Sequence, residues 1–361
     1  MKAGIIGFPS AGKSTLFKIL TKADIGPAAQ SRKRGGSAVG VATVPDSRLD
    51  RLSALFRPRK TTPAVIEFLD VPSFNRGAAA PEIRLGDFRN LDVLVHVVRA
   101  FDQDPLPQGE VPGLPEGNIT ELDLELILGD LTVIERRLER LQKDLKKMKN
   151  PDLIGEDALL RKCRQWLEQE KPLRSLRLSG EEKKRLRGFS FLSEKPVLHV
   201  LNLPDSAAAQ IPHLAEFYRL KTLAGQANVD MTAVCGKLEA ELAELADEEV
   251  EVFLADYGLA EPGLVRLIRT TYRLLGLISF FTVSEEECRA WTIPGGTPAL
   301  KAAGAVHSDM ERCFIRAEVI PWDVLLEVES LSAARQRGLL RLEGKEYPVQ
   351  DGETIYFRHS A

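Results

Sequence analysis

The hydrophobic residues of this chain form several short apolar runs. Such runs occur at residues 3–6, 65–69, 93–98 and 197–201, and the last two are almost entirely apolar. Near-continuous apolar runs of this length are typical of strands that are buried on both faces of a mostly parallel sheet. The pattern therefore predicts an α/β domain.

A helical pattern separates the last two of these runs. Its apolar residues fall at alternating spacings of three and four, which forms a heptad seam. The seam consists of Leu124, Ile127, Leu131, Ile134, Leu138, Leu141, Leu145 and Met148. The sequence Asn150-Pro151-Asp152 breaks this helix, and a second amphipathic segment around Cys163 can run back along it. Ser179 and Glu182 form a capping box for a third, short helix. Residues 118–195 are therefore predicted to be an inserted α-helical coiled-coil hairpin.

The last part of the chain changes pattern again. Short strand candidates at residues 280–283, 289–293, 314–319 and 354–358 are separated by turns that contain glycine. These features predict a small α+β module at residues 278–361.

Residues 7–14 read Gly-Phe-Pro-Ser-Ala-Gly-Lys-Ser and match G-x-x-x-x-G-K-[ST] between the first predicted strand and a helix-compatible segment. Gly7 and Gly12 allow the backbone to turn and to approach a polyphosphate. Lys13 would reach the β- and γ-phosphates, and the Ser14 hydroxyl would coordinate Mg²⁺. A plain glycine-rich turn is the alternative, but the strand before the motif and the helix after it favour a phosphate site.

Polar residues at two strand ends narrow the class of P-loop protein. Asp70 ends the predicted strand 65–69, where switch NTPases have a carboxylate that holds Mg²⁺ through water. Asn202 ends the strand 197–201, and Asp205 follows it with the spacing of the base-reading N-K-x-D of GTPases. Each feature alone also fits a turn. Their order after the P-loop predicts a switch NTPase rather than a kinase.

Composition adds few constraints. The 361 residues are 44% hydrophobic and 28% charged, which is typical of a globular protein with two or three domains. The four cysteines contain no C-x-x-C pair, which fits reduced thiols in a cytoplasmic protein. The longest apolar run, at residues 274–281, is short, so neither a signal peptide nor a membrane span is expected.

The charge is unevenly distributed along the chain. Residues 135–187 carry a net charge of +7, so the rest of the chain carries −10 within a total of −3. A basic arm on an acidic protein suits a polyanion such as RNA. A solvated helical face is the alternative explanation, and the sequence leaves both open.

The sequence resembles the YchF family of Obg-like ATPases over essentially its whole length. The matching motifs are Gly-Lys-Ser-Thr-Leu-Phe (12–17), Val-Pro-Asp-Ser-Arg-Leu-Asp (44–50), Glu-Phe-Leu-Asp (67–70), His-Val-Val-Arg (96–99), Lys-Pro-Val-Leu (195–198), Leu-Glu-Ala-Glu-Leu-Ala-Glu-Leu (238–245), Arg-Ala-Trp-Thr-Ile (289–293), Phe-Ile-Arg-Ala-Glu-Val (314–319) and Leu-Arg-Leu-Glu-Gly-Lys (340–345). The resemblance implies a nucleotide domain, an inserted helical coiled-coil domain and a C-terminal TGS-type β-grasp module. It also implies ATP hydrolysis and ribosome association.

The chain departs from the family after Asp70. Where the family usually has D-x-x-G, this chain has serine at position 73, in place of the glycine whose N–H meets the γ-phosphate. Ser73 keeps an N–H, but Pro72 stiffens the loop, so blunted switching is expected. Phe74 stands where GTPases have a water-orienting glutamine, and the family likewise has a hydrophobic residue there.

Residues 30–37 occupy the position of the family's switch I threonine, a Mg²⁺ ligand, and contain no threonine. Either Ser31 or Ser37 substitutes for it, or the ligand is lost. Two functional classes remain: a slow ATPase that acts as a conformational timer on a ribosomal partner, and a nucleotide-binding scaffold with little turnover. The intact P-loop favours the first class. A purely structural RNA-binding protein would require the P-loop to be vestigial.

The base preference rests on the segment after Asn202. Leu203 replaces the lysine of N-K-x-D, and Pro204 fixes the backbone just before Asp205. The carboxylate is then not aimed at a guanine edge. ATP is therefore expected to bind as well as or better than GTP, in agreement with the preference that the resemblance implies.

These inferences define one predicted site and its partners. The predicted catalytic residues are Lys13, Asp70 and Ser73, and the predicted Mg²⁺ ligands are Ser14 and Asp70. The predicted nucleotide-binding residues are Phe8, Pro9, Ser10, Ala11, Gly12, Lys13, Ser14, Thr15, Asn202, Leu203, Asp205, Cys235 and Gly236. The P-loop domain, with a mostly parallel sheet, is predicted at residues 1–117 and 196–277. The ribosome or structured RNA is the expected partner, bound through the helical arm and the C-terminal module.

Overall fold

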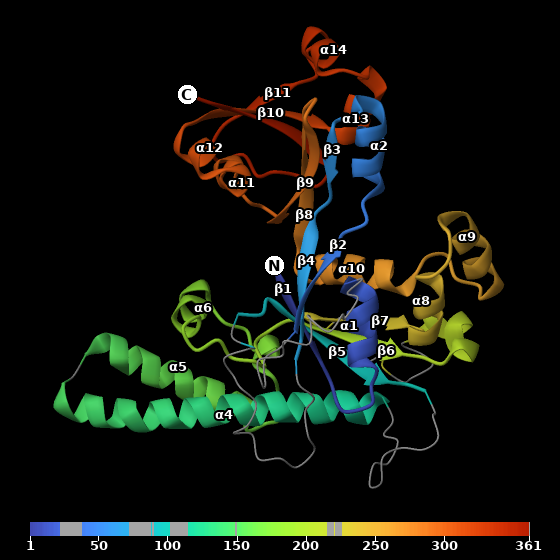
Figure 1. The fold of residues 1–361 in the computed structure, drawn as a ribbon. Coiled ribbons are helices and arrows are strands. Elements are labelled where there is room, and N and C mark those ends of the chain that lie inside the picture. The colour runs from blue at the N-terminus through green and yellow to red at the C-terminus, as the bar shows by residue number, and fades with distance from the viewer. Residues whose placement is uncertain are drawn as a thin grey trace. The chain divides into compact units, whose positions relative to one another are not determined.

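The computed structural model describes residues 1–21, 38–71, 88, 90–101, 115–148, 150–214, 220 and 226–360. The chain divides into two compact units. The first unit comprises Met1–Val41 and Glu67–Leu274, and the second comprises Ala42–Ile66 and Leu275–Ala361. The described residues form two six-stranded sheets (Figure 1).

The sheet of the first unit has the order β2-β4-β1-β5-β6-β7. Its strands are β1 (Lys2–Ile6), β2 (Ala38–Thr43), β4 (Val65–Asp70), β5 (Val93–Arg99), β6 (Val197–Asn202) and β7 (Val229–Val234). The pairs β1–β4, β1–β5, β5–β6 and β6–β7 are parallel. Every residue of β6, and every residue of β5 except the last, is buried. The four strands predicted from apolar runs in this unit are thus confirmed, as is the mostly parallel sheet.

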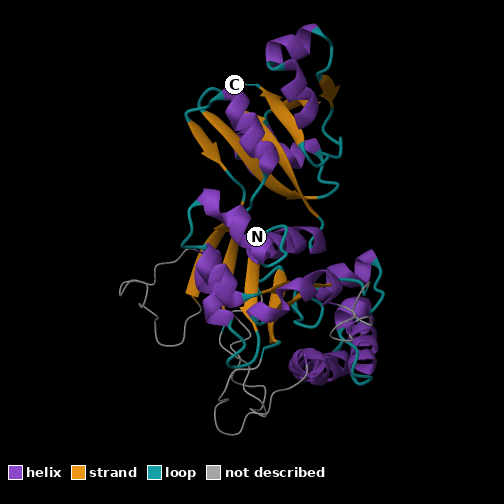
Figure 2. Cartoon of the chain, turned by 90° about the vertical axis from the view of Figure 1, so that its right-hand side faces the viewer, coloured by secondary structure: helices purple, strands orange, loops and turns teal. Residues whose placement is uncertain are grey.

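Helices lie beside the strands of this unit (Figure 2). They are α1 (Lys13–Thr21), α4 (Pro115–Lys147), α5 (Pro151–Leu167), α6 (Gly180–Leu186), α8 (Gly236–Leu242), α9 (Asp247–Asp256) and α10 (Gly263–Leu274), with the 3₁₀ helices η1 (Leu173–Ser175) and η2 (Asp205–His213). Within the described part of the chain, none of the helices has an apolar stretch of the length that a membrane span requires.

The helical insertion is a hairpin of α4 and α5, which run antiparallel (Figure 1, green). Residues of the predicted seam on α4, including Ile134 and Leu141, pack against Leu160 and Cys163 of α5 in one apolar cluster. Asn150 caps α5, because its Oδ1 accepts a hydrogen bond from the Asp152 N–H at 2.8 Å. The predicted break between the two helices is therefore confirmed.

Two details of the insertion follow from its local sequence. The predicted capping box of α6 is present, because Ser179 and Glu182 each accept a hydrogen bond from the other's backbone N–H. The seam stops packing before its last predicted member, since Met148 is 60% exposed. The apolar contact of α4 with α5 thus ends near the turn that joins them.

The second unit contains the mixed sheet β11-β10-β12-β8-β9-β3. Its strands are β3 (Lys60–Thr62), β8 (Leu277–Val283), β9 (Glu287–Pro294), β10 (Phe314–Pro321), β11 (Arg341–Glu343) and β12 (Glu353–His359). Its helices are α2 (Ser47–Phe56), α11 (Ala299–Val306), α12 (Ser308–Arg312), α13 (Trp322–Val328) and α14 (Leu331–Gln336). The four strands predicted in the C-terminal segment are present within this sheet.

Residues 42–66, which the sequence prediction assigns to the P-loop domain, belong to this second unit. Strand β3 pairs in parallel with β9, so that Lys60 is opposite Glu287. On α2, Arg48 forms an ion pair with Asp351 at 2.6 Å. These contacts join segments separated by more than 200 positions, and no local pattern predicts such pairing.

Candidate functional site

The loop between β1 and α1 has the backbone geometry of a phosphate-binding loop. Gly7 and Gly12 have φ angles of 146° and 94°, and Ser10 has a φ angle of 59°. A β-carbon on Gly7 would lie 2.6 Å from the Val97 carbonyl oxygen, and one on Gly12 would lie 2.3 Å from Asn202 Nδ2. Glycine is therefore required at both positions. The loop leads into α1, whose first N–H groups have no acceptor within the helix and favour an anion.

Lys13 is the charged residue of this loop. It is only 7% exposed, and its Nζ donates a hydrogen bond to the Phe8 carbonyl oxygen at 2.9 Å. Burial lowers the pKa of Lys13 from 10.5 to about 8, and the Asp70 carboxylate partly offsets this effect. A desolvated cation gains strongly from an anionic ligand. Lys13 is thus positioned to bind a phosphate group that enters the loop.

Two oxygen-bearing side chains meet beside Lys13. The Ser14 hydroxyl, in the first turn of α1, donates a hydrogen bond to Asp70 Oδ2 at 3.4 Å. Asp70 is the last residue of β4 and lies opposite Ile5 in the parallel pair of β4 with β1. A hydroxyl and a carboxylate are ligands of the kind that Mg²⁺ prefers, so this pair fits the ion.

Asn202 links three loops at the carboxyl edge of the sheet. Its Nδ2 donates a hydrogen bond to the Ala11 carbonyl oxygen at 3.1 Å, and its Oδ1 accepts one from the Gly236 N–H at 3.1 Å. The side chain is buried. The structure thus brings together three predicted site residues from the ends of β1, β6 and β7.

The side chains of Leu203 and Cys235, which are both predicted nucleotide-binding residues, belong to an apolar core cluster. Leu203 is 3% exposed and packs with Ile119 and Leu238 in a core cluster. Cys235 belongs to the same cluster, and its thiol donates to the Pro204 carbonyl oxygen at 3.8 Å. Because both side chains pack in the core, only the backbone at these two positions can contact a ligand.

Asp205 lies at the start of η2, and its carboxylate forms an ion pair with Lys237. Its Oδ2 lies 3.3 Å from the Nζ of Lys237, and this contact raises the pKa of Lys237. Lys237 is absent from the predicted site. The signal that could have found it is its place directly after Gly236, at the end of the strand next to β6 in the parallel sheet.

A buried histidine pair lies behind the loop. His96 of β5 and His199 of β6 are opposite each other in the sheet, with their Nδ1 atoms 3.1 Å apart. Burial, followed by the nearby charges of Lys13 and Arg174, lowers the pKa of His96 to about 3, and burial also lowers that of His199. Both rings are therefore neutral, and one Nδ1 donates to the other. Phe8 of the loop contacts His96 edge-on, with ring centroids 6.5 Å apart.

Several predicted switch residues lie outside the described part of the chain. They are Ser31, Ser37, Pro72, Ser73 and Phe74. The predicted catalytic role of Ser73 stays a prediction. Of the predicted loop residues, Ser10, Ser14 and Thr15 are exposed, whereas Phe8 and Ala11 are buried.

The first strand of this mostly parallel sheet leads into a glycine-bounded loop, and Lys13, Ser14 and Asp70 lie together at the carboxyl edge of the sheet. This arrangement defines a P-loop nucleotide-binding protein. Comparison with known proteins gives the particular family: the chain belongs to the YchF family. The family model YchF-GTPase_C, described as a protein of unknown function (DUF933), matches residues 277–360. The resemblance predicted from the motifs is confirmed.

The relatives match the chain from end to end. The ribosome-binding ATPase YchF of Bacillus subtilis is 39% identical over 362 residues, which covers 99% of each chain. The ribosome-binding ATPase YchF of Escherichia coli O157:H7 is 38% identical over 360 residues, which covers 99% of this chain and 98% of that one. The structure of the Schizosaccharomyces pombe YchF GTPase has a TM-score of 0.85 at 27% identity and covers 99% of this chain and 97% of that one. The predicted fold class of an α/β P-loop domain with a helical insertion and a C-terminal domain is confirmed.

Proposed function

We propose that this protein is a slow nucleoside triphosphatase that favours ATP and acts in association with the ribosome in the cytoplasm. The observation that carries the proposal is the meeting of Lys13, Ser14 and Asp70 beside an intact phosphate loop. The names of its full-length relatives, ribosome-binding ATPase and GTPase, support hydrolysis over a scaffold without turnover.

We further propose that Mg²⁺ is the cofactor of this site. The Ser14 hydroxyl and the Asp70 carboxylate are its proposed ligands, because they meet at 3.4 Å beside the lysine that would bind the phosphates. The ion would neutralise charge on the β- and γ-phosphates. Lys13 would hold the phosphate chain, and the glycine-bounded loop would enclose it.

Unstimulated hydrolysis of Mg-ATP is expected at a rate on the order of 10⁻³ per second or less, the range of GTPases without a stimulating partner. The reason is the predicted loss of the glycine at position 73, after Asp70, and of the switch I threonine. A single-turnover assay measures the rate. Ser73→Gly should raise it, whereas Ser73→Ala, which removes the hydroxyl without freeing the backbone, should not. Turnover of about 1 per second or faster by the unmodified protein would contradict this account.

The pair of Asp205 and Lys237 supports a preference for adenine. Guanine recognition requires a carboxylate that accepts hydrogen bonds from two N–H groups of the base. The Asp205 carboxylate already accepts from the ammonium of Lys237, so part of its capacity is used. Adenine needs no such acceptor at that edge. A site without a well-placed carboxylate discriminates only modestly between the two bases.

ATP is therefore expected to bind as well as or better than GTP, and Lys237→Ala should shift the affinity ratio towards GTP by freeing Asp205. Lys237→Arg is the matched control, because it keeps the cation. Substituting Leu203 by lysine is a poorer test, since Leu203 is buried in the core. Competition of both nucleotides against one fluorescent analogue measures the ratio. A GTP preference of more than about tenfold in the unmodified protein, worth about 1.4 kcal/mol, would contradict the adenine preference.

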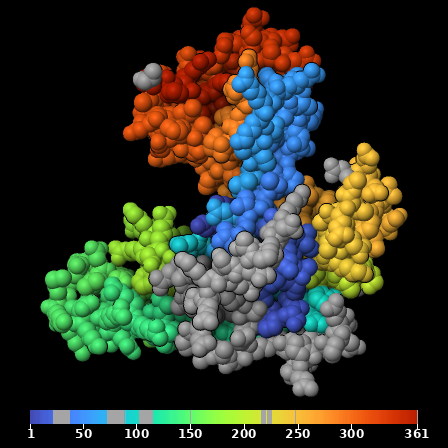
Figure 3. Space-filling view, viewed as in Figure 1, coloured from blue at the N-terminus to red at the C-terminus, as the bar shows by residue number. Residues whose placement is uncertain are grey.

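The helical arm offers a surface for the proposed ribosomal partner. Four exposed basic residues are spaced by four, three and four positions, so they form one stripe along α4. The stripe consists of Arg136, Arg140, Lys143 and Lys147. Arg137 is not part of it, because its Nε and Nη2 form hydrogen bonds of 2.7 and 2.9 Å to the Glu156 carboxylate. The arm is green in Figure 3, at the lower left of the view. The stripe suits the phosphates of structured RNA.

Binding of the protein to ribosomes or structured RNA should weaken steeply with salt, because phosphate contacts release counterions. Replacing all four stripe residues with glutamine should reduce the slope of log K against log salt by about 3. The matched control replaces Arg137 and Arg161, which are ion-paired with acidic residues, and should change the slope little. Filter-binding titrations over a range of salt concentrations measure the slope. An unchanged slope in the stripe variant would leave the arm as a solvated face.

A further inference from the structure

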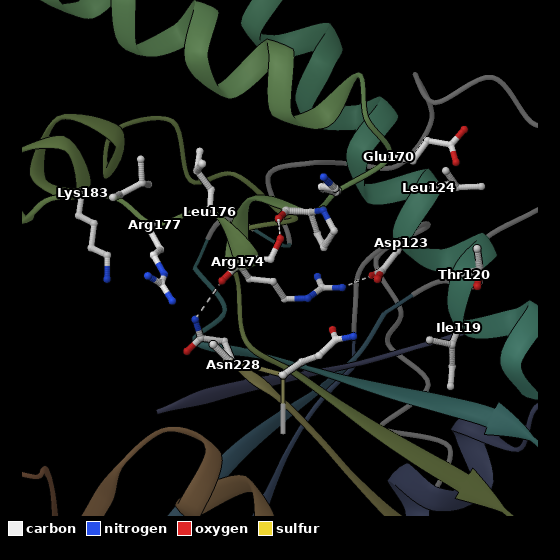
Figure 4. A pocket seen from close by; sticks show the side chains of 16 residues that line it. Ile119, Thr120, Asp123, Leu124, Glu170, Arg174, Leu176, Arg177, Lys183 and Asn228 are labelled. Atoms are coloured by element: carbon white, nitrogen blue, oxygen red, sulfur yellow. Dashed lines mark hydrogen bonds and ion pairs between the residues drawn. The ribbon is translucent and has the colours of Figure 1, made fainter. Parts of the chain in front are cut away.

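A pocket of about 890 Å³ lies in the first unit (Figure 4). Its walls come from the first half of α4, from residues 170–178, from Lys183 of α6 and from residues 226–228. Residues 226–228 precede β7, whereas the phosphate loop follows β1 in the same parallel sheet. The pocket is therefore at the amino edge of the sheet, and the phosphate loop is at the carboxyl edge. None of the predicted site residues lines it.

Arg174 is a buried cation in the wall of this pocket. It is only 5% exposed, and its Nη2 donates a hydrogen bond to Asp123 Oδ1 of α4, as Figure 4 shows. Its Nε and Nη1 are buried and have no hydrogen-bond partner among the described residues. A guanidinium carries five N–H donors, and leaving buried donors without acceptors is unfavourable. The Nε and Nη1 groups of Arg174 are therefore donors beyond the one that contacts Asp123.

Two further cations reach the same cavity. Arg177 and Lys183 are exposed, and Figure 4 shows their charged ends on the side of the pocket where Asn228 lies. The ionisable lining residues are Asp123, Glu170, Lys171, Arg174, Arg177 and Lys183. The lining therefore carries a net charge of +2 at neutral pH. The described residues provide no ion-pair partner for Arg177 or Lys183, so the positive charge is concentrated there.

The rest of the lining consists of apolar and uncharged polar residues. Leu124 of α4 and Leu176 provide apolar surface, and Gln226 and Asn228 provide the amide groups. The volume is in the range of pockets that hold drug-sized ligands. A dianionic group joined to a flat body with a polar edge would match the cations, the leucines and the amides in turn.

We propose that this pocket binds a nucleoside monophosphate unit, with Arg174, Arg177 and Lys183 holding its phosphate. Leu124 and Leu176 pack against the base or the ribose. A phosphate monoester carries a charge between −1.5 and −2 at neutral pH, which matches the net charge of the lining. The unit is a free nucleotide or the 5′-phosphorylated end of an RNA. This site goes beyond the proposed hydrolysis and does not depend on it.

Calorimetric titration of 5′-AMP into the full-length protein, with the P-loop saturated by Mg-ADP, tests the proposal. The unmodified protein should bind AMP at one additional site with a Kd of about 1 mM or lower, and adenosine at least about tenfold more weakly. Charge reversal of the pocket by Arg177→Glu with Lys183→Glu should weaken AMP binding by about tenfold or more. The matched control is Lys184→Glu with Arg187→Glu, which are exposed neighbours that do not line the pocket. It should retain AMP affinity to within about threefold.

The affinity for Mg-ADP should be equal in all these proteins, which shows that neither the fold nor the P-loop accounts for the loss. A 5′-phosphorylated RNA trinucleotide separates the two sources of the ligand. Binding more than about tenfold tighter than AMP would assign the pocket to RNA ends, and otherwise it is a free-nucleotide site. If neither AMP nor the trinucleotide binds, if adenosine binds as well as AMP, or if both charge reversals have the same effect, the proposal is wrong.

Discussion

Replacing Lys13 with alanine is expected to weaken Mg-ATP binding by at least about tenfold and to leave the fold intact. The buried Lys13 ammonium supplies a positive charge to the phosphates. Its hydrogen bond to the Phe8 carbonyl oxygen contributes only a small part of the stability of the domain, so the fold should survive the substitution. Calorimetry measures the affinity, and circular dichroism checks the fold. Lys18→Ala, on the same helix but with its side chain exposed, is the matched control.

The pH dependence of Mg-ATP binding gives a second readout of the same lysine. Burial lowers the pKa of Lys13 to about 8, and a bound phosphate raises it again by favouring the charged form. Above about pH 8 the free protein loses this proton, so the affinity should fall by up to about tenfold per pH unit. Lys13→Ala should lack this fall. Equal affinities in the two proteins, or the same pH profile, would remove the phosphate-site interpretation.

Asn202→Ala is expected to lower the free energy of unfolding by about 1–3 kcal/mol, because it leaves the Ala11 carbonyl and the Gly236 N–H without their buried partner. Mg-ATP affinity should fall by about tenfold or more as well, since the phosphate loop loses its link to the ends of β6 and β7. Urea denaturation measures the first effect and calorimetry measures the second.

Ser206→Ala is the matched control for this substitution. Ser206 lies in η2, four residues after Asn202, and is exposed, so stability and affinity should both change little. A loss of stability in Asn202→Ala with normal nucleotide affinity would show that the amide only supports the fold.

The sequence alone determined the features whose cause is local. Apolar runs such as 93–98 and 197–201 lie between two covered faces, and they became buried strands for that reason. The Asn150-Pro151 break and the capping box at Ser179 act through neighbouring backbone groups, so they appear where the pattern predicts them. The P-loop motif is likewise one continuous segment, so its two glycines can be identified from the sequence alone.

Only the tertiary structure decided which distant segments meet. It assigned residues 42–66 to the second unit through pairing of β3 with β9, and it brought His96 opposite His199. It also placed Asp205 next to Lys237, and Arg174 next to Asp123 in the wall of the pocket. Each of these depends on strand order and register between segments far apart in the chain. Hydrophobic periodicity specifies which side of a segment is buried but not which partner covers it.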